Sequence, residues 1–64
     1  MDDAFVAYGE GHADGRAGRA DAARAASPET GADYRVGVVD GQLAAFEDAL
    51  VAAIRRAMGD KLDG

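Results

Sequence analysis

One spaced motif occurs twice in this chain and constrains its fold more than any other feature. The motif is Tyr-x-x-Gly-x-x-Asp-Gly, first from Tyr8 to Gly15 and again from Tyr34 to Gly41. Tyr34 follows Tyr8 by 26 residues, and the other three positions keep that offset. An internal repeat predicts two equivalent elements that pack on each other.

The short length of the chain predicts a single domain, residues 1–64, with a thin core. A chain of 64 residues buries only about 60% of the surface that its unfolded form exposes. The sequence contains no cysteine, so neither a disulfide nor a thiolate metal site can add stability. We therefore expect a homo-oligomer, most simply a dimer, because a second copy would supply buried area.

The charge of the chain restricts its partners. Twelve acidic residues against seven basic ones give a net charge of −5, which opposes binding to nucleic acid. The chain begins Met1-Asp2-Asp3, which is acidic where a secretory signal is basic, and no apolar run approaches the roughly 20 residues of a membrane span. These features predict a cytoplasmic protein whose partner is another protein or a macromolecular assembly, not a membrane.

Helix signals predict an all-α fold of two helices. Ser27 suits an N-cap and Pro28 the first helical position. Asp2 or Asp3 can cap an earlier helix, and Gly59 is a typical C-terminal stop. The expected boundaries are a helix over 3–25, a turn at 26–27, a helix over 28–58 and a frayed tail over 59–64.

The second predicted helix has two faces to bury. One is a heptad seam of larger apolar residues, a spacing that excludes a strand and favours contact with another chain. The other is lined with small residues, as is the first helix, and lets two backbones approach closely. The interface residues expected, for self-association or a partner, are Val36, Val39, Leu43, Phe46, Leu50, Val51, Ile54 and Met58. The residues expected to pack the two helices together are Tyr8, Gly11, Gly15, Gly18, Tyr34, Gly37, Gly41 and Ala44.

We expect the two helices to form an antiparallel hairpin about a turn near Ala26, and the seam to join two hairpins into a dimeric bundle. The competing interpretation is that residues 9–18 form a flexible loop. The expected facing pairs are Gly11 with Gly41, Gly15 with Gly37, Tyr8 with Ala44 and Tyr34 with Gly18.

No pattern in the sequence predicts an enzyme. The glycines from Gly9 to Gly15 have the wrong spacing for a nucleotide-binding loop and no flanking sheet. His12 is the only histidine, and in the antiparallel register it lies opposite Asp40, which favours an ion pair over a general base. We therefore predict no catalytic residue, no cofactor and no metal site.

The acidic residues have structural explanations as well as functional ones. Asp14 and Asp40 recur in the motif, and we expect them to contact Arg16, Arg35 or His12. Four acids on one side of the first helix form either an ordinary solvated surface or a stripe that docks on a basic protein. The residues of this stripe are Asp3, Glu10, Asp14 and Asp21.

Part of the chain resembles the ribosome modulation factor family. The likeness covers residues 7–41, and the matching positions are Tyr8, Gly11, Gly15, Arg16, Gly18 and Gly37. The family consists of small two-helix proteins that bind ribosomes during dormancy. The chain lacks the family's Cys-Pro-Tyr connection, its tryptophans and its basic charge. RNA binding would need one basic strip, formed by His12, Arg16, Arg19, Arg55 and Arg56.

The leading prediction is a small non-enzymatic protein-protein interaction module, either a regulator or a structural subunit of a larger assembly. It would act through the apolar seam of the second helix. The alternatives are a ribosome- or RNA-associated factor and an acidic inhibitor of a nucleic-acid-binding protein.

Overall fold

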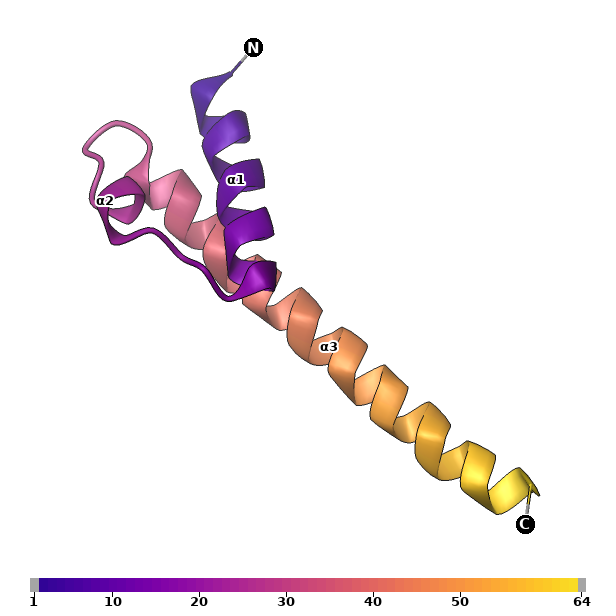
Figure 1. The fold of residues 1–64 in the computed structure, drawn as a ribbon. Helices are drawn as coiled ribbons and strands as arrows, with labels where there is room; N and C mark the ends of the chain where they lie inside the picture. The colour runs from indigo at the N-terminus through magenta and orange to yellow at the C-terminus, as the bar shows by residue number, and fades with distance from the viewer. Residues whose placement is uncertain (1, 64) are drawn as a thin grey trace.

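The chain folds into three helices, shown in a computed structural model that describes residues 2–63, with side chains described through residue 59. They are α1 (Asp3–Ala17), α2 (Ala22–Ala25) and α3 (Gly31–Asp63) (Figure 1). Residues 2–63 contain no strand. The predicted all-α class is therefore confirmed.

Helix α1 begins and ends at capping residues. The side chain of Asp2 accepts a hydrogen bond from the backbone N–H two residues ahead, at 3.0 Å, which confirms it as the N-cap. Gly18 ends the helix in the left-handed conformation, with φ of 71°. The N–H of Arg19 donates to the carbonyl of Asp14 at 2.8 Å, as in a Schellman motif. The predicted continuation of the first helix to residue 25 is therefore wrong.

The second long helix starts later and ends later than predicted. Ser27 Oγ accepts from the N–H of Thr30 at 3.4 Å, but this bond closes a turn, and α3 begins at Gly31 instead of Pro28. At the other end, α3 passes through Gly59 and continues to Asp63, because a glycine inside a helix costs only about 1 kcal/mol. The predicted tail is thus helical over 59–63, and the last residue, 64, lies outside the described residues.

Helices α1 and α3 cross while running in the same direction, so the predicted antiparallel hairpin is wrong (Figure 1). A Cβ added to Gly37 would lie 2.1 Å from the carbonyl oxygen of Tyr8, and one added to Gly41 would lie 2.1 Å from that of His12. From Gly37 to Gly41 the chain advances four residues along α3, and the carbonyls that these glycines contact advance four residues along α1, from Tyr8 to His12. The parallel direction follows from the early stop at Gly18, because the segment containing α2 carries the chain back before α3 begins.

The molecule is elongated and its core is small. Its radius of gyration is 16.0 Å, against about 11 Å for a compact domain of this length. Among the described residues, the only buried hydrophobic side chains are those of Ala7 and Tyr34, both at the crossing. Beyond the ion pair of Arg16 with Asp48, α3 continues for about 22 Å at 1.5 Å per residue.

Candidate interaction surface

Four glycines of the repeated motif bring α1 and α3 together. Gly11, Gly15, Gly37 and Gly41 are all buried. Each stands against a backbone carbonyl of the other helix, where an added Cβ would lie 2.1–2.2 Å from the oxygen. The predicted glycine-with-glycine pairs are therefore replaced by glycine-with-carbonyl contacts, in a parallel crossing. Backbones can approach this closely only because no side chain stands between them.

The glycine contacts are reciprocal between the two motif copies. Gly11 meets the carbonyl of Tyr34, and Gly37 meets the carbonyl of Tyr8, so the same two motif positions exchange roles. Gly15 and Gly41 meet the carbonyls of Val38 and His12, which are also 26 residues apart.

The motif tyrosines and aspartates form two equivalent hydrogen bonds. The Tyr8 hydroxyl donates to Asp40 Oδ2 at 2.6 Å, and the Tyr34 hydroxyl donates to Asp14 Oδ2 at 2.6 Å. The expected pairing of Asp40 with His12 is thus replaced by the bond from Tyr8. His12 instead lies near that tyrosine, with ring centroids 6.2 Å apart.

Each carboxylate raises the pKa of the tyrosine that it accepts from. The bond to Asp40, reinforced by burial, raises the pKa of Tyr8 above its usual value. The bond to Asp14 and burial likewise raise the pKa of Tyr34, although the N–H of Asp21, which donates to its hydroxyl at 2.9 Å, acts in the opposite direction.

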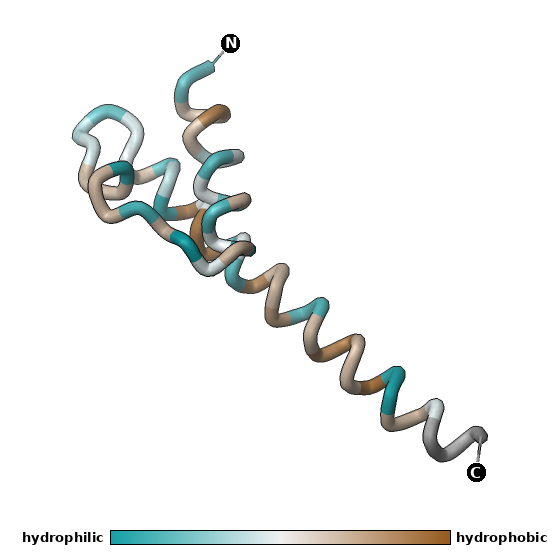
Figure 2. Tube along the Cα trace, in the orientation of Figure 1, coloured by the Kyte–Doolittle hydropathy of each residue, from teal (hydrophilic) through white to brown (hydrophobic). Residues whose placement is uncertain are grey.

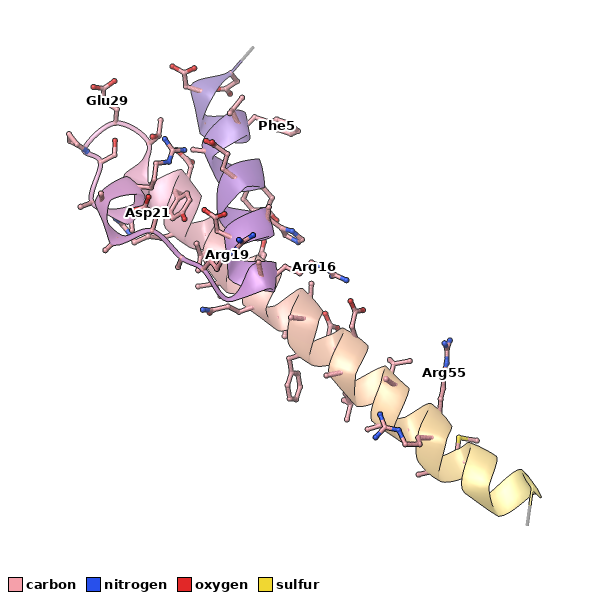
Figure 3. The ribbon with its side chains drawn as sticks, viewed as in Figure 1. Phe5, Arg16, Arg19, Asp21, Glu29 and Arg55 are labelled. Atoms are coloured by element: carbon pink, nitrogen blue, oxygen red, sulfur yellow. The ribbon has the colours of Figure 1, made fainter. Side chains whose placement is uncertain are left out.

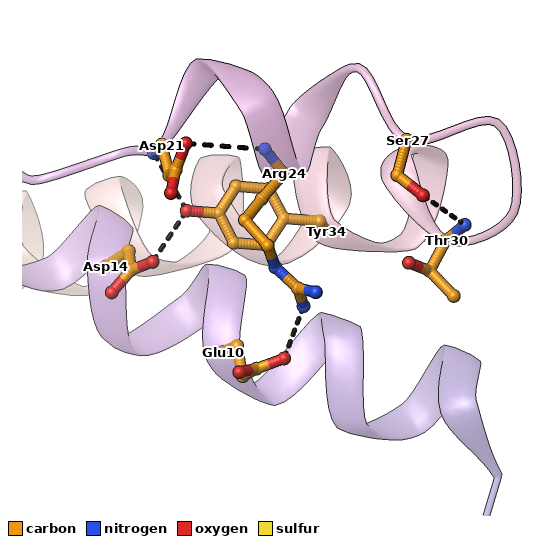
Figure 4. A network of polar contacts seen from close by, with 7 residues as sticks. All are labelled: Glu10, Asp14, Asp21, Arg24, Ser27, Thr30 and Tyr34. Atoms are coloured by element: carbon orange, nitrogen blue, oxygen red, sulfur yellow. Dashed lines mark hydrogen bonds and ion pairs between the residues drawn. The ribbon is translucent and has the colours of Figure 1, made fainter.

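Helix α2 is held over Tyr34 by polar contacts (Figure 4). The side chain of Asp21 accepts from the backbone N–H groups of the first turn of α2 and caps that helix. The guanidinium carbon of Arg24 lies 5.4 Å from the ring centroid of Tyr34, and the same side chain forms an ion pair with Glu10. Tyr34 is therefore enclosed and has no exposed surface.

These contacts occupy most of the acidic stripe predicted for the first helix. Glu10 binds Arg24, Asp14 binds Tyr34, and Asp21 caps α2. Neutralising the stripe would therefore remove contacts that hold the fold. It would not separate binding from folding, as an inhibitor docking by this stripe requires.

The remaining expected packing residues have different surroundings. Gly18 has open space where a Cβ would be added, so its role is to end α1 and not to pack against α3. Tyr8 and Ala44 are half-buried. Arg35, an expected partner of the motif aspartates, instead donates to the carbonyl of Ala25 at the end of α2.

The apolar seam of α3 faces away from α1 and is exposed. Hydrophobic positions recur along α3 (Figure 2), and the exposed fractions of the large apolar side chains there lie between 45% and 63%. On a helical wheel their directions centre about 130° from those of Gly37 and Gly41. These large side chains are Val36, Val39, Leu43, Phe46, Leu50, Val51, Ile54 and Met58. A smaller apolar site on α1 includes Phe5, which is 72% exposed and points into solvent (Figure 3).

The basic residues do not form the single strip that RNA binding would need. Arg16 is paired with Asp48. Figure 3 shows Arg55 far along α3 from Arg16 and Arg19. Arg55 and Arg56 are consecutive, so they point about 100° apart around the helix.

The described part of the chain contains neither a cluster of metal ligands nor a membrane span. Within it, no group of three or more histidine and acidic side chains could hold a metal ion. No helix there is both long enough and apolar enough to cross a membrane. A shallow hollow on the seam is lined by Ala32, Arg35, Val36, Val39 and Asp40.

Sequence reasoning missed several residues that build this structure. Val38 supplies the carbonyl against Gly15, Arg24 covers Tyr34, and Asp48 pairs with Arg16. The position of Val38 could have been found from the repeat, because it is the equivalent of His12 in the first copy.

No family model matches the chain, and neither the curated proteins nor the solved structures include a match. The resemblance to the ribosome modulation factor family therefore rests on the six motif positions alone.

Proposed function

We propose that this protein is a small non-enzymatic interaction module, a regulator or a structural subunit, that binds a protein partner through the apolar seam of α3. The observation that carries the proposal is the exposure of all eight seam side chains. The fold leaves these large apolar side chains uncovered, while it buries Gly37 and Gly41 on another face of the same helix.

The total surface area supports this proposal. The chain exposes 4756 Å², whereas a folded monomer of 6.5 kDa exposes about 3,800 Å². The excess, about 900 Å², is close to the roughly 800 Å² that each partner buries in an interface of standard size. One protein-protein interface would thus bring the exposed area to the level of a monomeric domain.

The polar side chains at the crossing support a structural role over a catalytic one. A general base needs a nucleophile or a bound substrate within hydrogen-bond reach. Tyr8, Tyr34, Asp14 and Asp40 instead satisfy one another across the two helices.

Site-specific photo-crosslinking in the native host tests the proposal. A photoreactive phenylalanine analogue at Phe46 lies on the seam, and the same analogue at Arg55 lies off the seam on the same helix. We expect covalent protein adducts from position 46 and few from position 55. Equal labelling from both positions would show that the seam is not the binding surface.

A variant with two charges on the seam serves as the control that should abolish binding. Leu43 and Leu50 are 54% and 48% exposed, so replacing both with glutamate should leave the helical circular dichroism unchanged. The adducts at position 46 should disappear in this variant, because a charge in an apolar interface is costly to desolvate.

A further inference from the structure

We infer that the partner on the α3 seam is a second copy of this chain, lying parallel and in register. This inference rests on the proposed function. Five of the seam residues, together with two alanines, follow heptad spacing: one row contains Val36, Leu43, Leu50 and Ala57, and the other contains Val39, Phe46 and Ala53. Apolar residues at both rows over three heptads are typical of helices that pair along their length.

Charges on the two sides of the seam favour the parallel orientation. On a helical wheel, Arg35 lies about 60° to one side of the centre of the five large residues in these rows, and Asp40 lies about 80° to the other side. In a parallel pair in register, these flanks meet, so Arg35 of each copy lies beside Asp40 of the other. The two symmetry-related contacts are both attractive.

The antiparallel orientation sets like charges together. It places the flank carrying Asp40 and Glu47 against the same flank of the other copy, acid against acid. In the register that pairs Leu43 with Phe46, it also brings Arg35 near Arg56 of the second copy. Charge complementarity therefore distinguishes the two orientations.

The rest of the fold leaves room for the second copy. Helix α1 packs on the opposite face of α3, and α2 contacts the side that carries Arg35. Val36 and Val39, at the level of α2, are still 56% and 62% exposed. The exposed area exceeds that of a typical monomer by about 900 Å², which is close to the area that one partner buries in a standard interface. One interface per copy favours a dimer over a larger assembly.

Cysteine crosslinking tests the orientation, because the chain contains no cysteine of its own. Two single-cysteine variants are made separately, Val36→Cys and Ala57→Cys. In the parallel dimer, each variant should form a disulfide between the same position of its two copies. An antiparallel pair in the register above would hold equivalent residues at least about 25 Å apart, far beyond disulfide reach. Disulfides that form only when the two variants are mixed would overturn the parallel orientation.

A charge at Gln42 tests the same geometry without a crosslink. Gln42 is exposed and, in the parallel pair, faces Glu47 of the second copy. Gln42→Lys should tighten the dimer about three- to fivefold at low salt, and Gln42→Glu should loosen it by a similar factor. Ala52→Lys, which adds the same charge on the opposite face, should leave the dissociation constant unchanged. Equal effects of lysine at positions 42 and 52 would contradict the proposal.

Sedimentation separates this inference from the proposed function. A dimer at micromolar concentration is expected. A monomer that still gives adducts to another protein from position 46 would overturn the second copy as the partner and leave the interaction module intact. A monomer without adducts would overturn both.

Discussion

The hydroxyl of Tyr34 donates to Oδ2 of Asp14 at 2.6 Å across the crossing of α1 and α3. The same bond, at the same length, joins Tyr8 to Asp40. Each tyrosine thus reaches the aspartate of the other motif copy, across two helices that run in the same direction. The repeated motif therefore specifies a helix crossing whose two sides make equivalent contacts.

Gly37→Ala should destabilise the fold, whereas Gly9→Ala should stabilise it. The new Cβ at position 37 would lie 2.1 Å from the carbonyl of Tyr8, so the helices must separate, at a cost of about 1–3 kcal/mol. At position 9, nothing lies within 4 Å, and the substitution should gain up to about 1 kcal/mol in helix propensity. Urea denaturation followed by circular dichroism measures both. A stabilising Gly37→Ala would show that the close crossing does not form.

Gly18→Ala should lower the free energy of unfolding by about 1–2 kcal/mol, although its Cβ would meet no neighbour. The cost is conformational, since position 18 has a φ of 71°, which alanine rarely adopts. Gly18→Asn should cost less, because asparagine tolerates the left-handed region better. If alanine and asparagine were equally costly in urea denaturation, backbone conformation would not be the cause.

The sequence predicts which faces meet but not the direction of the helices. Glycines spaced by four residues allow close approach in either direction, since near a crossing both orientations place the same small residues together. The direction depends on where α1 ends. Two residues in the sequence indicate that α1 ends early: Gly18 is a typical C-terminal stop, and Asp21 is a typical N-cap for a new helix. The helical spacing of small residues continues through Gly18, however, and favours one uninterrupted helix.

The polar part of the crossing joins a residue of one motif copy to a residue of the other. Tyrosine and aspartate are six residues apart in each copy, Tyr8 with Asp14 and Tyr34 with Asp40. Within one helix, residues six apart lie on different faces, so no bond forms inside a copy. In the parallel crossing, each tyrosine reaches the aspartate of the other copy.

Both tyrosines should ionise at higher pH in the folded chain than in the unfolded chain. Their hydroxyls donate to carboxylates, and these bonds raise both pKa values above the usual tyrosine pKa of about 10. Because the folded pKa is the higher one, the bonds contribute to stability below about pH 10, and this contribution is lost as the pH rises through the folded pKa. Tyrosinate absorbance should follow this shift in native protein and not in urea.

Single-tyrosine variants assign the alkaline transition, because the chain has two tyrosines and no tryptophan. Tyr8→Phe leaves Tyr34 as the only reporter, and Tyr34→Phe leaves Tyr8. The Tyr34 bond should survive to a pH at which the fold itself begins to open, because that side chain is fully buried. Identical titration curves in buffer and in urea would contradict the hydrogen bonds.

Arg24→Ala should destabilise the fold more than Arg16→Ala, although each removes one ion pair. The pair of Arg16 with Asp48 is exposed, with side-chain exposures of 52% and 60%, and should contribute no more than about 1 kcal/mol. Arg24 also lies over the ring of Tyr34, and this contact adds about 0.5–1 kcal/mol to the free energy of unfolding. Its removal would expose part of the Tyr34 ring, which is fully buried in the folded chain. Raised salt should weaken the ion pairs and spare the packing over the ring. Equal urea midpoints for the two variants would show that Arg24 contributes only its charge.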